Sequence, residues 1–221
     1  MKPLFILCLA ASLLLSAGAA SAVQKGPETY AIPLPPQPDY SGLKWLVGQW
    51  SGKRVGEAGQ GEVLLSVSYA LGKRFMMLRE EVSLPAVAGA PEIREGLLGI
   101  VSAGASAKVY NLALYSSNGF VMNYQVTAGA GEIDFNPAGG SLSPAGWLFR
   151  RVIRHTAPGQ CTETVDAAPP GKGFFRFYTA RLSQVLPGSK ARPASAAKPA
   201  KGHGIFFWRK LHRTSNAGGG S

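Results

Sequence analysis

The chain has 221 residues and a formal net charge of +11. This charge is unevenly placed, because residues 23–185 hold 15 Lys and Arg against 12 Asp and Glu, a net of +3, whereas residues 186–221 hold seven Lys and Arg and no acid. The main part of the chain is therefore almost neutral and carries no motif of a nucleic-acid-binding fold, so nucleic acid is excluded as an expected partner.

The first 22 residues have the pattern of a signal peptide. Lys2 precedes an apolar run from residue 4 to residue 15, and Ala20-Ser21-Ala22 follows as a small-x-small cleavage signal. A retained membrane anchor is the alternative, but an apolar core of about a dozen residues is shorter than the ~20 needed to span a bilayer. We expect cleavage after Ala22 and a periplasmic or secreted protein with one domain and appendages.

Cleavage at this position leaves a single cysteine, Cys161. A lone thiol cannot form a disulfide within the domain. Two interpretations stay open: a half-buried strand residue, or a reactive or intermolecular thiol.

The rest of the chain shows the patterns of β-strands. Residues 23–39 are Pro-rich and predict an extended lead-in, and residues 40–47 predict one short helical turn. From Gly48 onward, apolar and polar residues alternate in runs separated by turn signals, of which Asn118-Gly119 is the strongest hairpin cue. After the strand that begins at Gly48, the runs are 63–69, 75–82, 92–102, 109–115, 120–126, 133–135, 147–154, 160–166 and 174–182.

Successive hairpins favour an antiparallel meander, and a meander of this length avoids exposed edges by closing on itself. The sequence therefore predicts an all-β domain over residues 40–185. We expect a single antiparallel up-and-down β-barrel of about eight to ten strands, with a β-sandwich as the alternative. A barrel of this size has room for interior side chains or for one small ligand.

Residues 186–221 predict a basic, flexible tail. Residues 187–204 are rich in Pro, Ala, Lys, Gly and Ser and cannot bury enough apolar surface to become ordered. Residues 205–213 form an aromatic-basic segment that suits contact with an anionic membrane surface, through Phe206, Phe207, Trp208, Arg209 and Lys210. The alternative is that residues 205–208 pack on the domain as an extra strand.

The start of the domain resembles a known group of barrels. A short helical turn leads into Gly48-Gln49-Trp50-Ser51-Gly52, and a later hairpin reads Leu71-Gly72-Lys73-Arg74-Phe75. These motifs resemble those of calycins, the group of lipocalins, fatty-acid-binding proteins and nitrobindin-like barrels, and in particular a bacterial exported family of that type without an assigned function. The resemblance covers roughly residues 40–185.

The resemblance implies roles for three residues. Gly48 would allow a sharp turn into the first strand, and Trp50 would plug one end of the barrel. In calycins an Arg of the last strand often lies across that Trp ring. Arg176 and Arg181 are the candidates, and Arg181 is preferred because it lies nearer the end of the strand.

Nitrobindin-like barrels hold haem iron through a histidine near their C-terminus, so the resemblance raises haem as a cofactor. This chain departs from them, because Arg54 interrupts the glycine repeat that would follow Trp50. Of the three histidines, only His155 lies in a predicted strand, whereas His203 and His212 lie in the tail. We expect His155 to be a rim or core residue, with haem ligation as the alternative. No cluster with metal-ligand spacing is present.

An inward-facing cation would suit a ligand with an acidic head group. Arg79 shares one face of its strand with Met77, and it either takes that role or pairs at the surface with Glu62, Glu81 or Glu95. The expected ligand-binding wall, for which ordinary core packing is the alternative, consists of Tyr69, Met77, Arg79, Tyr110, Met122, Tyr124, Phe149 and His155.

No catalytic arrangement is found in the sequence. Glu80 and Glu81 are adjacent, so on a strand they point to opposite faces, and no serine has the Gly-x-Ser-x-Gly context of a hydrolase. We therefore expect a non-enzymatic barrel that binds a small hydrophobic or amphipathic molecule. The alternative is a packed structural barrel whose tail contacts the cell envelope.

Overall fold

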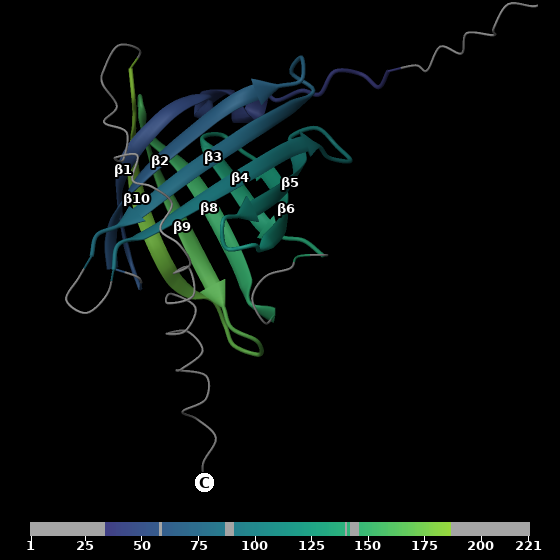
Figure 1. Ribbon diagram of the computed structural model, residues 1–221. Coiled ribbons are helices and arrows are strands. Elements are labelled where there is room, and N and C mark those ends of the chain that lie inside the picture. The colour runs from purple at the N-terminus through teal and green to yellow at the C-terminus, as the bar shows by residue number, and fades with distance from the viewer. Residues whose placement is uncertain (1–33, 58, 87–90, 140, 142–145, 187–221) are drawn as a thin grey trace, which may run out of the picture. The chain divides into compact units, whose positions relative to one another are not determined.

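The computed structural model describes residues 34–57, 59–86, 91–139, 141 and 146–186 (Figure 1). It divides into two units at Pro36, and residues 34–36 of the first unit have no regular secondary structure. The second unit contains the folded domain. The predicted signal peptide, most of the Pro-rich lead-in and the tail with residues 205–213 lie outside the described residues and stay predictions. No helix in the described part of the chain is long and apolar enough to cross a membrane.

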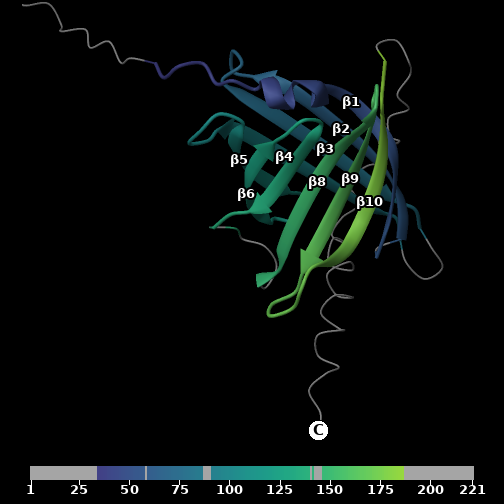
Figure 2. The same cartoon turned by 180° about the vertical axis from the view of Figure 1, so that it is seen from behind.

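In the described residues the domain contains one short helix and ten strands. They are η1 (Ser41–Leu46), β1 (Gly48–Gly56), β2 (Gly59–Ala70), β3 (Phe75–Leu84), β4 (Ile93–Ala103), β5 (Val109–Ser116), β6 (Val121–Ala128), β7 (Glu132–Pro137), β8 (Leu148–Ala157), β9 (Gln160–Ala168) and β10 (Phe175–Gln184). Each strand pairs antiparallel with the next, and β10 pairs with β1, so the sheet is a closed barrel (Figures 1 and 2). The predicted up-and-down barrel is confirmed, and the β-sandwich is wrong.

Hairpin chemistry explains the simple strand order. At the predicted Asn118-Gly119 turn, the Gly119 amide donates to the Ser116 carbonyl at 2.9 Å, and the Ser116 amide donates to the Phe120 carbonyl at 2.9 Å. This turn sets the register of β5 against β6, in which Tyr115 lies opposite Val121. Apolar residues spaced two apart then share one face of each strand, and that face turns inward when the sheet closes.

The η1 end of the barrel is filled by apolar side chains. Leu43 and Leu46 of η1 are buried there, and η1 lies across this end (Figure 2). The Trp50 ring is 2% exposed, its Nε1 donates to the Leu46 carbonyl at 2.8 Å, and it meets the Trp45 ring edge-on. Gly48 has φ +135°, a backbone conformation that favours glycine, so the turn into β1 forms there. Trp50 is thus buried at the barrel end where the resemblance places it.

The expected cap on Trp50 by Arg181 is wrong. Arg181 is exposed on the outer face of β10, because its neighbours Ala180 and Leu182 are the inward residues. Arg176, the other candidate, is also exposed and forms an ion pair with Asp166 at 2.6 Å. The hydrogen bond to the Leu46 carbonyl satisfies the Trp50 ring nitrogen instead.

Cys161 lies on the inner face of β9, where it is 2% exposed, and it forms no disulfide. Burial raises the pKa of its thiol to about 12, and the nearby Glu163 adds to this shift. The interpretation of Cys161 as a strand residue is confirmed, although it is fully rather than half buried.

Candidate functional site

The half of the barrel interior away from η1 contains charged side chains instead of a continuous apolar core. Arg54 of β1, Glu80 of β3, Arg151 of β8 and Glu163 of β9 are each at most 4% exposed. Alternation places them inside: Arg54 shares the inner face of β1 with Trp50, and Arg151 shares that of β8 with Phe149. The second half of the interior is therefore a candidate binding site.

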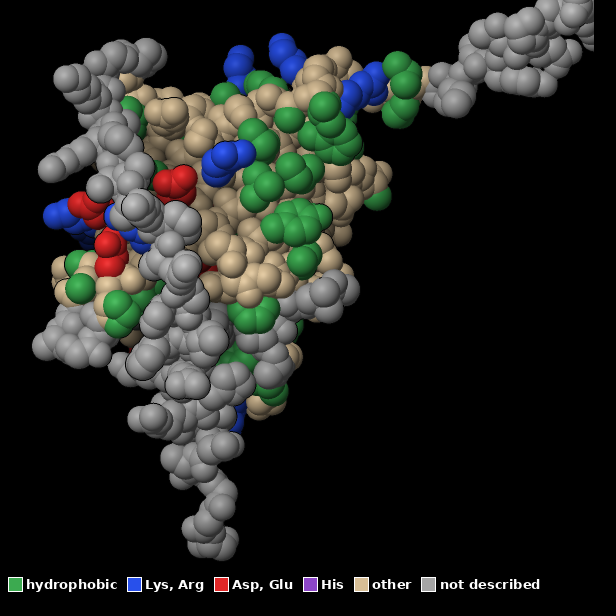
Figure 3. All heavy atoms as spheres, viewed as in Figure 1, with side chains coloured by type: hydrophobic (Ala, Val, Ile, Leu, Met, Phe, Trp, Pro, Cys, Tyr) green, Lys and Arg blue, Asp and Glu red, His purple; other side chains and the backbone are tan. Residues whose placement is uncertain are grey.

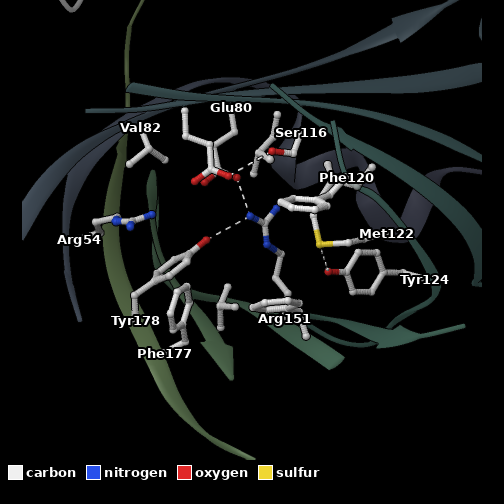
Figure 4. A pocket seen from close by; sticks show the side chains of 15 residues that line it. Arg54, Glu80, Val82, Ser116, Phe120, Met122, Tyr124, Arg151, Phe177 and Tyr178 are labelled. Atoms are coloured by element: carbon white, nitrogen blue, oxygen red, sulfur yellow. Dashed lines mark hydrogen bonds and ion pairs between the residues drawn. The ribbon is translucent and has the colours of Figure 1, made fainter. Parts of the chain in front are cut away.

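A cavity of about 60 Å³, counted as the space that the centre of a water molecule can occupy, lies among these side chains (Figure 4). Its wall combines charged, phenolic, aliphatic and aromatic groups. The lining residues are Arg54, Glu80, Val82, Glu95, Leu97, Leu114, Ser116, Phe120, Met122, Tyr124, Phe149, Arg151, Val165, Phe177 and Tyr178. Several of these, including Ser116 and Phe120 at the β5–β6 turn, are half-buried, so the cavity approaches solvent there.

Arg151 connects three strands across the interior. Its Nη2 donates to Glu80 Oε2 at 2.6 Å and to the Tyr178 hydroxyl at 3.1 Å (Figure 4). Its Nε lies 2.6 Å from Glu163 Oε1, but neither oxygen of Glu163 accepts a well-aligned hydrogen bond. Burial alone would lower the pKa of Arg151, but Glu163 and Glu80 outweigh burial and raise it. Arg151 is thus a fixed cation held by two carboxylates.

Two interior carboxyls, the buried Glu163 and the partly buried Glu95, bind protons more tightly than usual. Burial raises the pKa of Glu163 to about 7, and Glu80 adds to the shift, whereas Arg151 and Arg54 oppose it. Burial also raises the pKa of Glu95, whose Oε1 accepts hydrogen bonds from Ser116 Oγ and Asn118 Nδ2, both at 3.2 Å. Glu80 and Glu95 lie on the inner faces of adjacent strands one diagonal step apart, since Glu95 is opposite Val82.

Aromatic rings form one side of the cavity. The Phe149 and Phe177 rings meet at 5.9 Å, and Trp147 and Phe175 extend the cluster beyond the cavity wall. A β-bulge between Arg176 and Tyr178 turns both Phe177 and Tyr178 inward. The cavity therefore has a charged side and an apolar side.

Three residues expected on the binding wall lie on it: Met122, Tyr124 and Phe149. Burial raises the pKa of Tyr124 to about 12, and its hydroxyl donates to Met122 Sδ at 3.6 Å. Tyr110 is buried but lies at the η1 end, stacked on Tyr40 at 5.5 Å. Tyr69 is 36% exposed at the same end and 6.3 Å from Tyr40. Neither tyrosine lines the cavity.

The inward position considered for Met77 and Arg79 is wrong. Arg79 lies at the surface, but among the described residues it forms no ion pair with Glu62, Glu81 or Glu95, so the expected surface pair is not found. Arg79 is exposed on the outer face of β3, and Glu80 takes the inner face instead. In the sheet register Arg79 lies opposite Leu98, which lies opposite Tyr115. Hydrophobic side chains gather on this outer face over β3–β5 (Figure 3), where Leu98 and Tyr115 are 36% and 46% exposed.

His155 does not line the cavity. It is exposed near the end of β8, where its ring lies 5.4 Å from Trp45. No histidine is among the described residues of the cavity wall, so a haem held inside the cavity by His155 does not fit. In the described part of the chain, no group of three or more His, Cys, Asp or Glu side chains is placed to hold a metal ion.

Sequence reasoning missed the charged interior. Arg151 could have been found, because alternation places it on the same face of the strand as Phe149 and Ile153. Arg150 and Arg154 lie on the opposite face. Arg54 could have been found from its even spacing to Trp50. For Glu80 the signal was the apolar face of Met76, Leu78 and Val82, on which it lies.

The fold and the site define a closed ten-stranded antiparallel β-barrel with a small, charged and partly aromatic internal cavity. No protein-family model and no curated protein matches the chain.

Among solved structures, the chain is similar to that of Rv2717c from M. tuberculosis, at 16% identity and a TM-score of 0.53, over 70% of this chain and 100% of that one. A weaker match is the structure of EF1p2_mFAP2b bound to DFHBI, at 13% identity and a TM-score of 0.29 over 65% of this chain and 97% of that one. Another is a protein of unknown function from the DUF3598 family of Nostoc punctiforme, at 7% identity and TM-score 0.19 over 69% of this chain and 100% of that one. The first of these likenesses shows the fold alone, and the other two carry no argument.

Proposed function

We propose that the barrel binds a small amphipathic molecule, without covalent chemistry, through the internal cavity. The observation that carries this proposal is the cavity itself: a barrel that served only as a scaffold would fill this space with apolar side chains. Buried charged groups destabilise a core unless they are paired, so their presence beside an open space favours a binding role over a packing role. The resemblance to calycins, many of which are binding barrels, supports the same conclusion.

The size of the cavity limits the ligand. A volume of about 60 Å³ on this measure holds roughly four to six water molecules. A long acyl chain does not fit in that space. The polar end of a small molecule would enter, and its apolar part would contact Phe149, Phe177 and Met122 toward the half-buried rim.

The contacts of the two carboxyls on the cavity wall, Glu80 and Glu95, support binding without catalysis. Glu80 is engaged by Arg151 at 2.6 Å, and Glu95 accepts two hydrogen bonds from Ser116 and Asn118. A general base needs a carboxylate that is free to take a proton from a substrate. For Glu80 and Glu95 these contacts favour a fixed polar surface that orients a bound molecule. Glu163 has no well-aligned hydrogen bond, but it is paired with Arg151 and does not line the cavity.

Purification from the natural host tests the proposal. We expect native mass spectrometry to detect a small molecule on the wild-type protein and not on Val82→Phe, which adds bulk to the cavity wall. Ser83→Phe is the matched control, because Ser83 lies on the outer face of the same strand. Circular dichroism would establish that both variants fold. A wild-type protein without a bound molecule, or equal occupancy in Val82→Phe, would contradict the proposal.

A further inference from the structure

Arg54 is a buried cation that points into the cavity from β1 (Figure 4). It is 3% exposed, and its guanidinium lies over the face of the Tyr178 ring, 4.6 Å from the centroid. The neighbouring inward positions of β1 are Gly52 and Gly56, which have no side chains to crowd it. The guanidinium thus lies between the Tyr178 ring and the cavity.

The other charged groups of the cavity wall form hydrogen bonds, whereas Arg54 interacts with Glu95 and Glu163 only through its charge. Arg151 is bound by Glu80, Glu163 and Tyr178, and Glu95 accepts from Ser116 and Asn118. Among the described residues, no hydrogen bond or ion pair reaches Arg54, and its Nε is buried without an acceptor. Contact with the Tyr178 ring compensates only part of the loss of water around a buried guanidinium.

An acceptor is therefore missing at this point of the cavity. We propose that Arg54 binds the carboxylate of the ligand, so that the molecule held by the barrel is a small monoanion. This inference rests on the proposed binding function and names the class of molecule.

Geometry and charge both favour a carboxylate. The planar guanidinium offers parallel N–H donors that match the two oxygens of a carboxylate. A carboxylate has only three heavy atoms, which suits a cavity of about 60 Å³. A dianion such as phosphate would be repelled more strongly by Glu80 and Glu95, which share the wall with Arg54.

Three probes of nearly the same shape test the sign of the charge: benzoate, benzamide and benzamidine. We expect benzoate to bind at pH 7 at least tenfold more tightly than benzamide, because charge-assisted hydrogen bonds are the stronger ones, and benzamidine to bind most weakly. In ¹⁵N NMR spectra, benzoate should shift the Nε–H resonance of Arg54. Tighter binding of benzamidine would overturn the inference and assign the site to cations, held by Glu80 and Glu95, while the proposed binding function would stand.

Variants test the residue itself. We expect Arg54→Met to lose at least tenfold in affinity for benzoate and Arg54→Lys, which keeps the charge but not the paired donors, to lose less. Arg79→Met is the matched control, because Arg79 is exposed on the outer face. Unchanged benzoate binding by Arg54→Met overturns the inference. If that variant does not fold, the wild-type probe series and the Arg54 resonance decide alone. No response to any probe also overturns it, and the binding function is then judged by the host-purified protein.

Discussion

The buried ion-pair network around Arg151 allows a strong test of the structure. The Arg151 side chain is 5% exposed, and its two carboxylate partners, Glu80 and Glu163, are 3% and 1% exposed. Removing one member of a buried ion pair leaves uncompensated charge in the interior and costs about 3–5 kcal/mol. Two carboxylates lose their partner in Arg151→Met, so we expect a loss of unfolding free energy in that range.

Urea unfolding followed by circular dichroism measures this loss. With a dependence of about 2 kcal/mol per molar urea, the midpoint of Arg151→Met should fall by roughly 2 M. The matched control is Arg154→Met on the same strand, because Arg154 pairs with Glu132 at the surface, where the two side chains are 56% and 36% exposed. Such exposed pairs contribute about 0–1 kcal/mol, so the control should shift the midpoint by less than about 0.5 M.

A triple variant separates broken pairing from lost volume. Replacing Glu80, Arg151 and Glu163 together by Leu, Met and Leu removes the two carboxylates as well as the guanidinium that pairs with them. Replacement of a whole buried ion pair by apolar residues of similar size is often neutral or stabilising. We therefore expect the triple variant to be more stable than Arg151→Met. Equal midpoints for Arg151→Met and Arg154→Met, or a triple variant as unstable as Arg151→Met, would refute the account of the network.

Three further predictions follow from single residues. The pKa of Glu163 is about 7 in the folded protein against an ordinary 4.5, so the folded state binds this proton more tightly than the unfolded state. Protonation of Glu163 therefore stabilises the fold fully below pH 4.5, and this stabilisation is lost as the pH rises through 7. Between pH 5 and pH 8 the unfolding free energy of the wild-type protein should fall on the order of 3 kcal/mol more than that of Glu163→Gln. An equal fall in the two proteins would contradict this. Gly52→Ala should lower the unfolding free energy of the protein by more than about 3 kcal/mol, because the added Cβ would lie 1.8 Å from the Arg181 carbonyl oxygen. Gly96→Ala is the control in the same urea titration, because its added Cβ would meet only Ser117, at 4.0 Å. The Cys161 thiol, 2% exposed with its pKa raised to about 12, should not react with an aromatic disulfide reagent at pH 8 until urea unfolds the protein; fast reaction of the folded protein would be the contrary result.

Several features of the fold and the site could be predicted from the sequence. Alternation and turn residues predicted the strands and their antiparallel order, because side chains alternate between the two faces of a strand. The same alternation placed Met122, Tyr124 and Phe149 on an inner wall, and all three line the cavity. The Gly48-x-Trp50 motif indicated the barrel end at which Trp50 is buried.

Other residues were misplaced for reasons that lie beyond one strand. On β3 a charged residue falls on either face, Arg79 on one and Glu80 on the other, so alternation alone does not choose between them. Glu80 faces inward and is stabilised there by Arg151, which is 71 residues away in the chain. The bulge in β10, which turns Phe177 and Tyr178 inward together, breaks the alternation on which the prediction rested.

Local patterns are enough to predict the strand positions, the hairpin order and the apolar face of most strands, because these depend on neighbours within a few residues. Closure of the sheet alone decided which charged side chains meet inside. Arg54, Glu80, Arg151 and Glu163 come from four different strands, and only the register of the closed barrel brings them into one interior. Burying a charge is costly unless an opposite charge lies beside it, and only the tertiary structure brings Arg151 to Glu80 and Glu163.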